Sequence, residues 1–403
     1  MCIRDSISHV RQVLENIGEE LDLEVYFKWL DEETSKEEGN LLSDKAKKLM
    51  DSVLQSCDED MMNKVNTIMT QVKEKLAPTV IEFFPKIMEA APDIPSDEVI
   101  DPLLQYISSN MGKLGQALLT PVFLSILHDI WKDTIHHLKL EYDKIPHKPT
   151  TRQQHVRLRE IALTLEMFFE AGGNGLTKTQ METDEYKSLI EELNLANMTT
   201  EQLTREFLQD LAKQQVEANG EFGILRFSHL YVEKEKKLHI NVVSARGIPG
   251  LDKSGKSDPY VEIHLLPIEL FPSAAEKHYK TDTKKQTLEP FFNKQFSIPV
   301  EEGNLKQDGG VILLAMFDHD KIGSDDFAGL CVVPTNSTPT GTELKMEHQH
   351  IFHYKHTPSY MELEKRIAEK IASDFLKMMK KFVFEGDCPH GHPFKKLRLF
   401  SKS

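Results

Sequence analysis

The spacing of apolar residues divides the chain into a helical first half and a strand-rich second half. Up to about residue 220, apolar side chains recur every three or four positions, which is the spacing of one face of a helix. After Asn219-Gly220 the spacing changes to two, which is typical of half-buried strands. Helical spacing returns between Ser359 and Phe384. These patterns predict a helical region, an all-β region and a terminal amphipathic helix.

Breaks and start signals subdivide the helical region. Proline and glycine clusters at 91–95, 145–149 and 171–175 predict loops. The pairs Asp101-Pro102 and Thr120-Pro121 each resemble an N-cap followed by proline at the first helical position. We therefore expect about seven or eight helices, which run antiparallel where their loops are short.

The two ends of the helical region carry further signals. Helical spacing is already present from Ile7 to Ile17, so we expect the chain to begin inside the bundle, as the C-terminal part of a longer protein. Thr199 and Gln202 have the spacing of a capping box. This predicts that the last helix of the region begins next to Thr199.

Residues 221–358 combine short apolar runs with glycine and proline punctuation. About 130 residues organised in this way favour a β-sandwich. The run from Val311 to Phe317 is the longest uninterrupted apolar stretch, and it is far shorter than the ~20 residues that a membrane-spanning helix needs. We therefore expect no transmembrane segment. The predicted strands include 223–228, 238–243, 260–266, 311–317 and 327–333.

Charge is distributed unevenly between these regions. The chain of 403 residues carries 49 Lys+Arg and 64 Asp+Glu, a formal net charge of −15. Residues 1–221 account for −17, residues 222–358 for −2 and residues 359–403 for +4. The acidity therefore belongs to the helical region, and it argues against a nucleic-acid partner. Four scattered cysteines argue against a disulfide framework and for a reducing compartment.

Two aspartate clusters lie in loops next to predicted strands. Asp252 and Asp258 form the first cluster, and Asp318, Asp320 and the pair Asp325-Asp326 form the second. If both loops lie at one end of a sandwich, five or six carboxylates meet there and repel one another. Calcium, which takes about six to eight oxygen ligands, removes this repulsion. Because no His or Cys is interleaved at zinc spacing, the sequence predicts a calcium site.

Other interpretations of these loops fit less well. The segment 250–257 satisfies the pattern of a phosphate-binding loop, but Asp258-Pro259 and a strand follow it where a helix is needed. The second cluster begins like an EF-hand, but Ile322 and Gly329 stand where ligands are required. A pair of solvated acidic loops is the simplest alternative for either cluster alone.

The joint spacing of the clusters and the strand motifs around them resemble a C2 domain, a calcium-dependent phospholipid-binding module. The resemblance is carried by residues 223–228, 238–248, 257–261 and 287–293, the last of which reads Thr-Leu-Glu-Pro-Phe-Phe-Asn. It implies an eight-stranded antiparallel C2 β-sandwich in the synaptotagmin-like arrangement. It also implies about two Ca²⁺ ions. The implied metal ligands are Asp252, Asp258, Asp318, Asp320 and Asp326.

The same resemblance implies contact between the loop tips and a membrane. Three lysines stand beside the aspartates, and two apolar residues are expected to enter the membrane interface by analogy with the family's loop tips. For Ile322, ordinary packing within the loop is the alternative. The expected membrane-contacting residues are Leu251, Lys253, Lys256, Lys321 and Ile322.

Two further segments are candidates for lipid contact. Lys280, Lys284 and Lys285 lie on the strand expected before Thr287, where related domains bind phosphoinositides. Because Asp282 lies among them, a solvated sheet edge is an alternative. The helix expected from residue 359 to 384 either lies on a membrane or packs back on the sandwich or the helical region.

The helical region carries a second resemblance. Residues 101–110, 119–131 and 168–176 resemble the second Munc-homology region of the Unc-thirteen (Munc-thirteen) family. In that family an elongated helical MUN-type rod precedes the last C2 domain. The complete aspartate set is closer to the Munc-thirteen-four and brain-angiogenesis-inhibitor-associated branch than to the neuronal members. The expected domains are a helical MUN-type region at 1–220 with the Munc-homology region at about 95–210, a C2 domain at 221–358, and an amphipathic helix and basic tail at 359–403.

The resemblance implies a non-enzymatic role in vesicle tethering or priming and in SNARE-mediated exocytosis. Its implied partners are SNARE proteins and anionic phospholipid membranes, with peripheral recruitment from the cytoplasm to the plasma membrane or to secretory or endosomal vesicles. One alternative is a scaffold whose C2 domain binds protein partners without calcium-driven lipid binding. Another is a lipid-modifying or GTPase-activating enzyme targeted by its C2 domain, although no nucleophile elbow, His-Glu-x-x-His motif or paired-cysteine site supports an enzyme.

Overall fold

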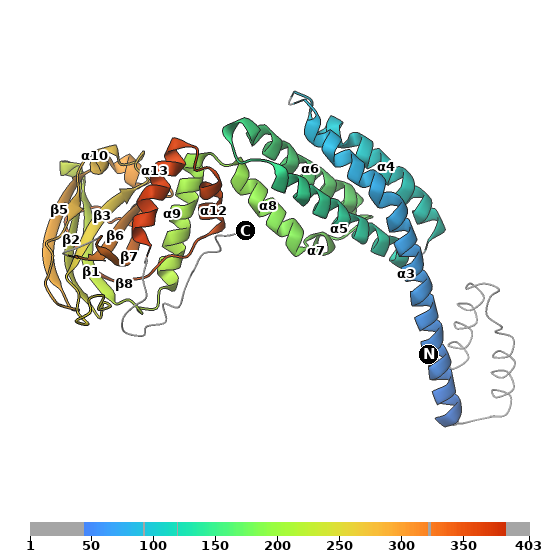
Figure 1. Cartoon of the computed structure of the whole chain (residues 1–403), viewed down its shortest axis with the longest axis horizontal. Coiled ribbons are helices and arrows are strands. Elements are labelled where there is room, and N and C mark those ends of the chain that lie inside the picture. The colour runs from blue at the N-terminus through green and yellow to red at the C-terminus, as the bar shows by residue number, and fades with distance from the viewer. Residues whose placement is uncertain (1–43, 92, 119, 321–323, 384–403) are drawn as a thin grey trace. The chain divides into compact units, whose positions relative to one another are not determined.

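The computed structural model describes residues 44–91, 93–118, 120–320 and 324–383 (Figure 1). The chain divides into two compact units, Met1–Leu76 and Ala77–Ser403. The helical spacing from Ile7 to Ile17 and the basic tail after residue 383 lie outside the described residues. None of the described helices combines the length and the apolar character that crossing a membrane requires.

Seven helices precede the strands in the described residues. The predicted capping box of Thr199 and Gln202 is confirmed at the start of α9, and α5 begins at Thr120 as predicted. The start predicted at Asp101 is wrong, because the helix begins at Ser96 and contains Pro102. The helices are α3 (Asp44–Glu89), α4 (Ser96–Ala117), α5 (Thr120–Lys144), α6 (Arg152–Glu170), α7 (Lys178–Met181), α8 (Asp184–Asn197) and α9 (Thr200–Glu217).

Trp131 on α5 organises the core between α5, α6 and α8. Its side chain is fully buried, and its indole nitrogen donates to the carbonyl of Met181 at 3.0 Å. Phe169 from α6 and Tyr186 from α8 pack against its ring edge-to-face, with centroids 5.3 and 5.0 Å away. Such aromatic contacts add to the apolar burial and fix how the three helices meet.

The region after α9 folds into two four-stranded antiparallel sheets, in the orders β5-β2-β1-β8 and β4-β3-β6-β7. The apolar faces of the two sheets share one core. The predicted fold class, a helical region followed by an eight-stranded antiparallel sandwich, is therefore confirmed. The strands are β1 (Ile224–Val232), β2 (Lys237–Arg246), β3 (Pro259–Leu266), β4 (Tyr279–Lys280), β5 (Phe291–Pro299), β6 (Val311–Asp318), β7 (Asp326–Pro334) and β8 (Met346–His350).

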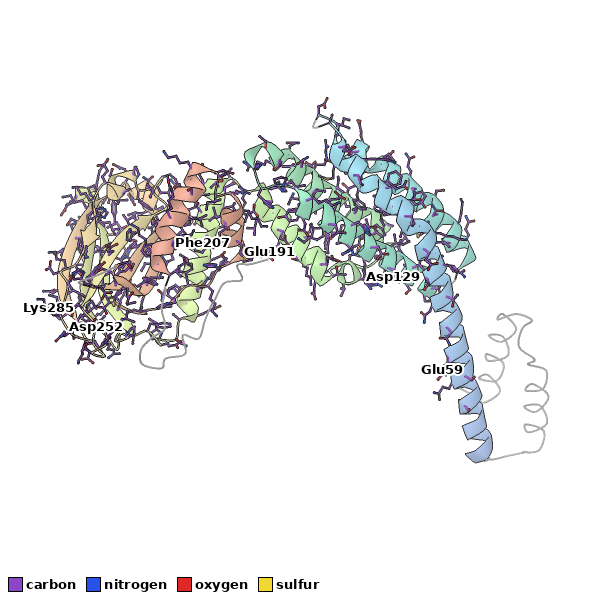
Figure 2. The ribbon with its side chains drawn as sticks, viewed as in Figure 1. Glu59, Asp129, Glu191, Phe207, Asp252 and Lys285 are labelled. Atoms are coloured by element: carbon purple, nitrogen blue, oxygen red, sulfur yellow. The ribbon has the colours of Figure 1, made fainter. Side chains whose placement is uncertain are left out.

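Three helices cover the outer face of the sheet that contains β6 and β7 (Figure 1). They are α9 and two helices that follow the strands, α12 (Pro358–Lys365) and α13 (Lys370–Met379). Phe207 on α9 is fully buried among them, and its place beside the sheet is labelled in Figure 2. The helical segment after residue 358 thus packs back on the sandwich. The sheet is the middle layer of three.

The single helix expected from Ser359 to Phe384 is interrupted between α12 and α13. At the break, the Arg366 side chain donates to the carbonyls of Ala196 and Met198 at 2.8 and 2.7 Å. No proline or glycine stands at this break. We therefore attribute the break to the tertiary hydrogen bonds of Arg366 and not to the local sequence. Ile367 and Ile371, expected on the apolar stripe, are 54% and 45% exposed.

Candidate metal centre

The strand register brings the two aspartate clusters to one end of the sandwich. Pro259 at the start of β3 lies opposite Asp318 at the end of β6. Asp318 in turn lies opposite Asp326 at the start of β7. Directly opposed residues have Cβ atoms about 5 Å apart. Asp258, Asp318 and Asp326 therefore stand at the ends of three neighbouring strands.

The loop between β2 and β3 folds back on itself and carries Asp252 to the same end. The amide of Asp252 donates to the carbonyl of Lys256 at 3.0 Å, and the amide of Gly255 donates to the carbonyl of Asp252 at 2.9 Å. Gly255 has a φ of +73°, a conformation that favours glycine. A Cβ on Gly250 would lie 2.4 Å from the Gly255 carbonyl, so this turn requires glycine at both positions.

Asp318 is the most deeply buried of the six aspartates, with 3% of its surface exposed. One of its carboxylate oxygens accepts a hydrogen bond from the Asp258 amide at 2.5 Å. Burial, reinforced by the negative charges of Asp252 and Asp320, raises the pKa of Asp318 to about 6. The side chain is thus held in place by β3 while its charge is poorly compensated.

The other carboxylates of this end also act on one another. Burial, followed by the charge of Asp252, raises the pKa of Asp320 above its ordinary value. Burial, followed by the charge of Asp320, raises the pKa of Asp326. Asp258 also contributes to the shift of Asp320, while its own Oδ1 accepts from the Gln286 amide at 2.6 Å. The five aspartates of the predicted ligand set therefore lie within electrostatic reach of one another.

Asp325 differs from these five, because its oxygens are used within the protein. They accept from the Tyr260 hydroxyl at 2.7 Å, from His319 Nδ1 at 3.0 Å and from the Asp320 amide at 3.1 Å. Although burial opposes the shift, these bonds hold the pKa of Asp325 below its ordinary value. Tyr260 and His319 were not predicted as site residues. The only feature of the sequence that could have indicated their role is their position close to the aspartates.

The donor set fits a hard divalent cation in its chemistry. The five side chains offer only carboxylate oxygens, and the raised pKa values of Asp318, Asp320 and Asp326 reflect burial first and the charges of neighbouring carboxylates second, both of which a bound cation would offset. Within the described part of the chain, however, no three of the acidic, histidine or cysteine side chains are already drawn together as a metal-binding group. The aspartates are therefore neighbours whose side chains must move closer to share one ion.

The residues expected to contact lipid have different positions. Lys253 and Lys256 are exposed on the first loop. The expectation for Leu251 is wrong, because its side chain is 8% exposed and belongs to the core of the sandwich. The loop folds inward at this residue, since its amide donates to the Ser257 hydroxyl at 3.0 Å. Lys321 and Ile322 lie outside the described residues.

The basic segment that was expected on a strand is only partly in one. The strand β4 ends at Lys280, whose ammonium lies 3.2 Å from the centroid of the Tyr260 ring. Lys284 and Lys285 follow it outside a strand, and Lys285 lies at the same end of the sandwich as Asp252 (Figure 2). Asp282 is 3.6 Å from the ammonium of Lys294, so its ion pair is made with a residue outside the predicted trio.

Both halves of the chain are similar to known proteins. The family model of the C2 domain matches residues 236–353. The chain is 27% identical over 278 residues to BAI1-associated protein 3 of Mus musculus, covering 69% of this chain and 24% of that protein. It is 27% identical over 287 residues to protein unc-13 homolog D of Rattus norvegicus, covering 71% of this chain and 26% of that protein.

The sandwich has its own relatives. Over 121 residues the chain is 36% identical to synaptotagmin-1 of Aplysia californica, covering 30% of this chain and 26% of that protein. These matches confirm the predicted C2 domain and the predicted resemblance to the Unc-thirteen family and its brain-angiogenesis-inhibitor-associated branch. The chain spans about a quarter of the length of the first two relatives.

Proposed function

We propose that this protein binds anionic phospholipid membranes in response to calcium and acts in vesicle tethering or priming before SNARE-mediated exocytosis. The observation that carries the proposal is the meeting of aspartates from two loops at one end of a C2 sandwich, where Asp252 and Asp320 help to raise the pKa of the buried Asp318. The similarity to unc-13 homolog D and to BAI1-associated protein 3 supports the vesicle role.

The proposed ligands are Asp252, Asp258, Asp318, Asp320 and Asp326, and they hold about two Ca²⁺ ions. When bound, calcium supplies positive charge and coordination positions that lipid phosphate oxygens can fill. The protein's own contribution is to place Asp258, Asp318 and Asp326 at the ends of three neighbouring strands and to present Lys253 and Lys256 on the first loop. Without neutralisation of the aspartates, this end of the sandwich repels an anionic surface.

The remaining parts of the proposal are supported by the resemblance to the Unc-thirteen family. We assign no enzymatic activity to the chain, and we place it in the cytoplasm, from which it is recruited peripherally to the plasma membrane or to secretory or endosomal vesicles. Lys280, Lys284 and Lys285 are proposed to assist by binding phosphoinositides. SNARE proteins are proposed partners of the helical region, which is the part that resembles the Munc-homology region.

Sedimentation of the full chain with phosphatidylserine-containing vesicles tests the calcium-dependent step. We expect binding with calcium and little binding with EGTA. Asp318→Asn should abolish the calcium-dependent fraction, because it removes the central buried carboxylate. Asp308→Asn, at an exposed position of the same domain, is the matched control and should bind like the wild type.

Two outcomes would contradict the proposal. If Asp318→Asn bound vesicles in calcium as well as the wild type, the aspartate cluster would not be the calcium sensor. If the wild type bound equally well with calcium and with EGTA, or failed to bind at all, the scaffold alternative would replace it. Recording the thermal unfolding of each variant separates loss of the site from loss of the fold.

A further inference from the structure

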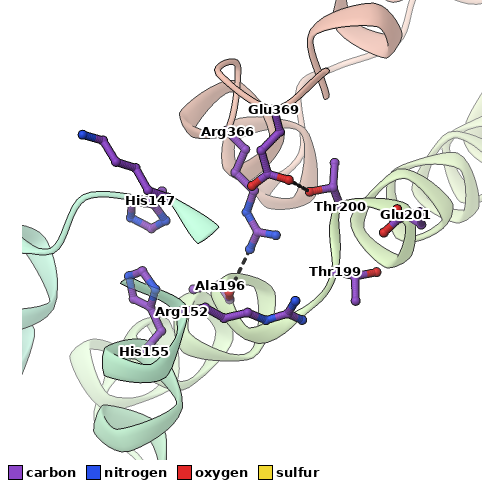
Figure 3. Close-up of a pocket in the computed structure, with 10 residues that line it drawn as sticks. His147, Arg152, His155, Ala196, Thr199, Thr200, Glu201, Arg366 and Glu369 are labelled. Atoms are coloured by element: carbon purple, nitrogen blue, oxygen red, sulfur yellow. Dashed lines mark hydrogen bonds between the residues drawn. The ribbon is translucent and has the colours of Figure 1, made fainter. Parts of the chain in front are cut away.

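A cavity of about 260 Å³ lies within the unit Ala77–Ser403, far along the chain from the metal centre. Three connections form its walls: the one between α5 and α6, the one between α8 and α9, and the one between α12 and α13. Figure 3 shows His147 and His155 on one side of this space and the first turn of α9 on the other. The site described above uses none of these residues.

Two cations line the cavity without an acidic partner among the described residues, Lys148 in the first connection and Arg152 at the start of α6. Lys148 and Arg152 form no ion pair with any carboxylate among the described residues, and both are exposed enough to meet a ligand from solvent. Arg152 donates through one guanidinium nitrogen to the carbonyl of Asn197 at 2.8 Å, which holds the side chain across the cavity mouth. Arg366 belongs to the wall, since Glu362 and the α8 carbonyls already occupy it.

His155 provides a buried polar atom with nothing to bind. Its side chain is 2% exposed, and its Nε2 has no hydrogen-bond partner in the described parts of the chain. Burial, assisted by the neighbouring His147, lowers the pKa of His155 to about 4, so the imidazole is neutral at pH 7. A buried nitrogen without a partner costs free energy, and a ligand in the cavity that it lines would remove that cost.

The opposite wall is the N-terminus of α9, a helix of 18 residues. Its N-cap Thr199 accepts from the amide of Gln202, so the amides of Thr200 and Glu201 are the ones that the helix itself does not pair. The helix dipole makes this end favourable for an anion. The carboxylates of Glu201 and Glu369 also line the cavity, and Glu369 accepts a hydrogen bond from the Thr200 hydroxyl.

We propose that this cavity binds a polyhydroxylated phosphate ester of the size of an inositol phosphate. The phosphate groups meet Lys148, Arg152 and the α9 N-terminus, with His155 as the buried hydrogen-bonding partner. The carboxylates of Glu201 and Glu369 favour a ligand that also carries hydroxyl groups, because neutral hydroxyls can donate to them, whereas inorganic phosphate brings only anionic groups, which they repel. This inference is independent of the calcium site.

Calorimetric titration of the full chain with inositol 1,4,5-trisphosphate in EGTA tests the proposal, with inorganic phosphate as the probe that lacks hydroxyls on a ring. We expect the inositol phosphate to bind and inorganic phosphate to bind more weakly. The double variant Lys148→Gln/Arg152→Gln should weaken binding about tenfold or more, since it removes two charge-assisted contacts. Lys113→Gln, which removes an exposed lysine on α4, is the matched control and should leave affinity unchanged.

A second arm distinguishes a lipid headgroup from a soluble ester. Vesicles that contain phosphatidylinositol 4,5-bisphosphate are sedimented with the protein in EGTA, with and without free inositol trisphosphate as competitor. Binding that the double variant loses and Lys113→Gln keeps supports the proposal and identifies the headgroup as the source. Calorimetric binding without vesicle binding supports it with a soluble ester as the ligand.

Three results would overturn the proposal: no binding of inositol trisphosphate to the wild type, unchanged affinity in the double variant, or an equal loss in Lys113→Gln. Because Lys148 and Arg152 are at the surface, the double variant is expected to fold. Its melting temperature without ligand checks this. Inositol trisphosphate should raise the melting temperature of the wild type and leave that of the double variant unchanged. This comparison is a second measurement of the same site.

Discussion

The two sheets of the sandwich differ in what lies on their outer faces. In β5 buried positions alternate with mostly exposed ones and in β2 with mostly half-buried ones, as expected for a sheet with one face toward solvent. In β6 every position is buried, because Ile312, Leu314 and Met316 face the other sheet while Val311 and Leu313 face the helices. The open sheet is a surface, and the covered sheet is the interior of a three-layer structure.

The covered sheet is also the one that carries most of the metal centre. Phe382, in the last described turn of the chain, packs against Phe317 and Phe327 with ring centroids 6.2 and 6.1 Å apart. These two phenylalanines are the chain neighbours of Asp318 and Asp326. The C-terminal helical segment therefore packs on the residues next to the aspartates, on the outer face of the sheet. We expect the sandwich and α9, α12 and α13 to fold as one unit.

The largest expected effect comes from making the same substitution on each sheet. Phe207→Ala removes a fully buried ring between α9 and the covered sheet and should cost about 3–5 kcal/mol of unfolding free energy. Phe291→Ala, on the open sheet at 62% exposure, should change it by less than about 0.5 kcal/mol. Urea denaturation measures both. Equal losses would mean that the helices do not form part of the folded core.

Acidification should also distinguish the covered sheet from the open sheet, with a smaller change in the free energy of unfolding. Burial lowers the pKa of His353, which contacts Ala328 and Phe327 on β7 of the covered sheet, to about 4. The unfolded chain therefore binds more protons between about pH 4 and pH 6.5, so stability falls as the pH decreases through this window. Between pH 7 and pH 5 the contribution of His353 to this loss should be about 1–2 kcal/mol.

Comparing variants isolates this contribution, because Asp318 titrates nearby with the opposite sign. His353→Gln should make the unfolding free energy fall by about 1–2 kcal/mol less between pH 7 and pH 5, while the contribution of His155, whose pKa burial also lowers, remains. His348→Gln, at an exposed position on the open sheet, should keep the wild-type difference. If both variants kept it, burial of His353 would not be the source of the acid sensitivity.

The smallest expected effect concerns how α9 begins. Thr199→Ala removes the side-chain acceptor of the Gln202 amide and should cost about 1 kcal/mol. Thr177→Ala removes the corresponding cap of α7, which lies away from the sandwich. Only the first substitution should also reduce calcium-dependent vesicle binding, because α9, unlike α7, packs against the covered sheet. A reduction of the same size in Thr177→Ala would argue against that support.

Much of the candidate site could be predicted because its information is local. The change of apolar period near residue 220 placed the sandwich, and the spacing of Asp252, Asp258 and Asp318 indicated a cation site. The position of Leu251 could not be predicted, since it depends on a tertiary turn in which the Leu251 amide donates to the Ser257 hydroxyl and the side chain enters the core. The signal for a covered sheet was present in the run Val311–Phe317, whose lack of alternation is typical of a strand buried on both faces.

The sequence alone determined which segments form helices and strands and which side chains could bind a cation, because periodicity and residue chemistry are properties of neighbours in the chain. Only the tertiary structure decided that α9 covers the sandwich, that the C-terminal helix breaks at Arg366, and that Lys148, His155 and the α9 N-terminus share a cavity. An apolar or charged face does not specify its partner. Arg366 and Ala196, for example, meet across 170 residues of chain.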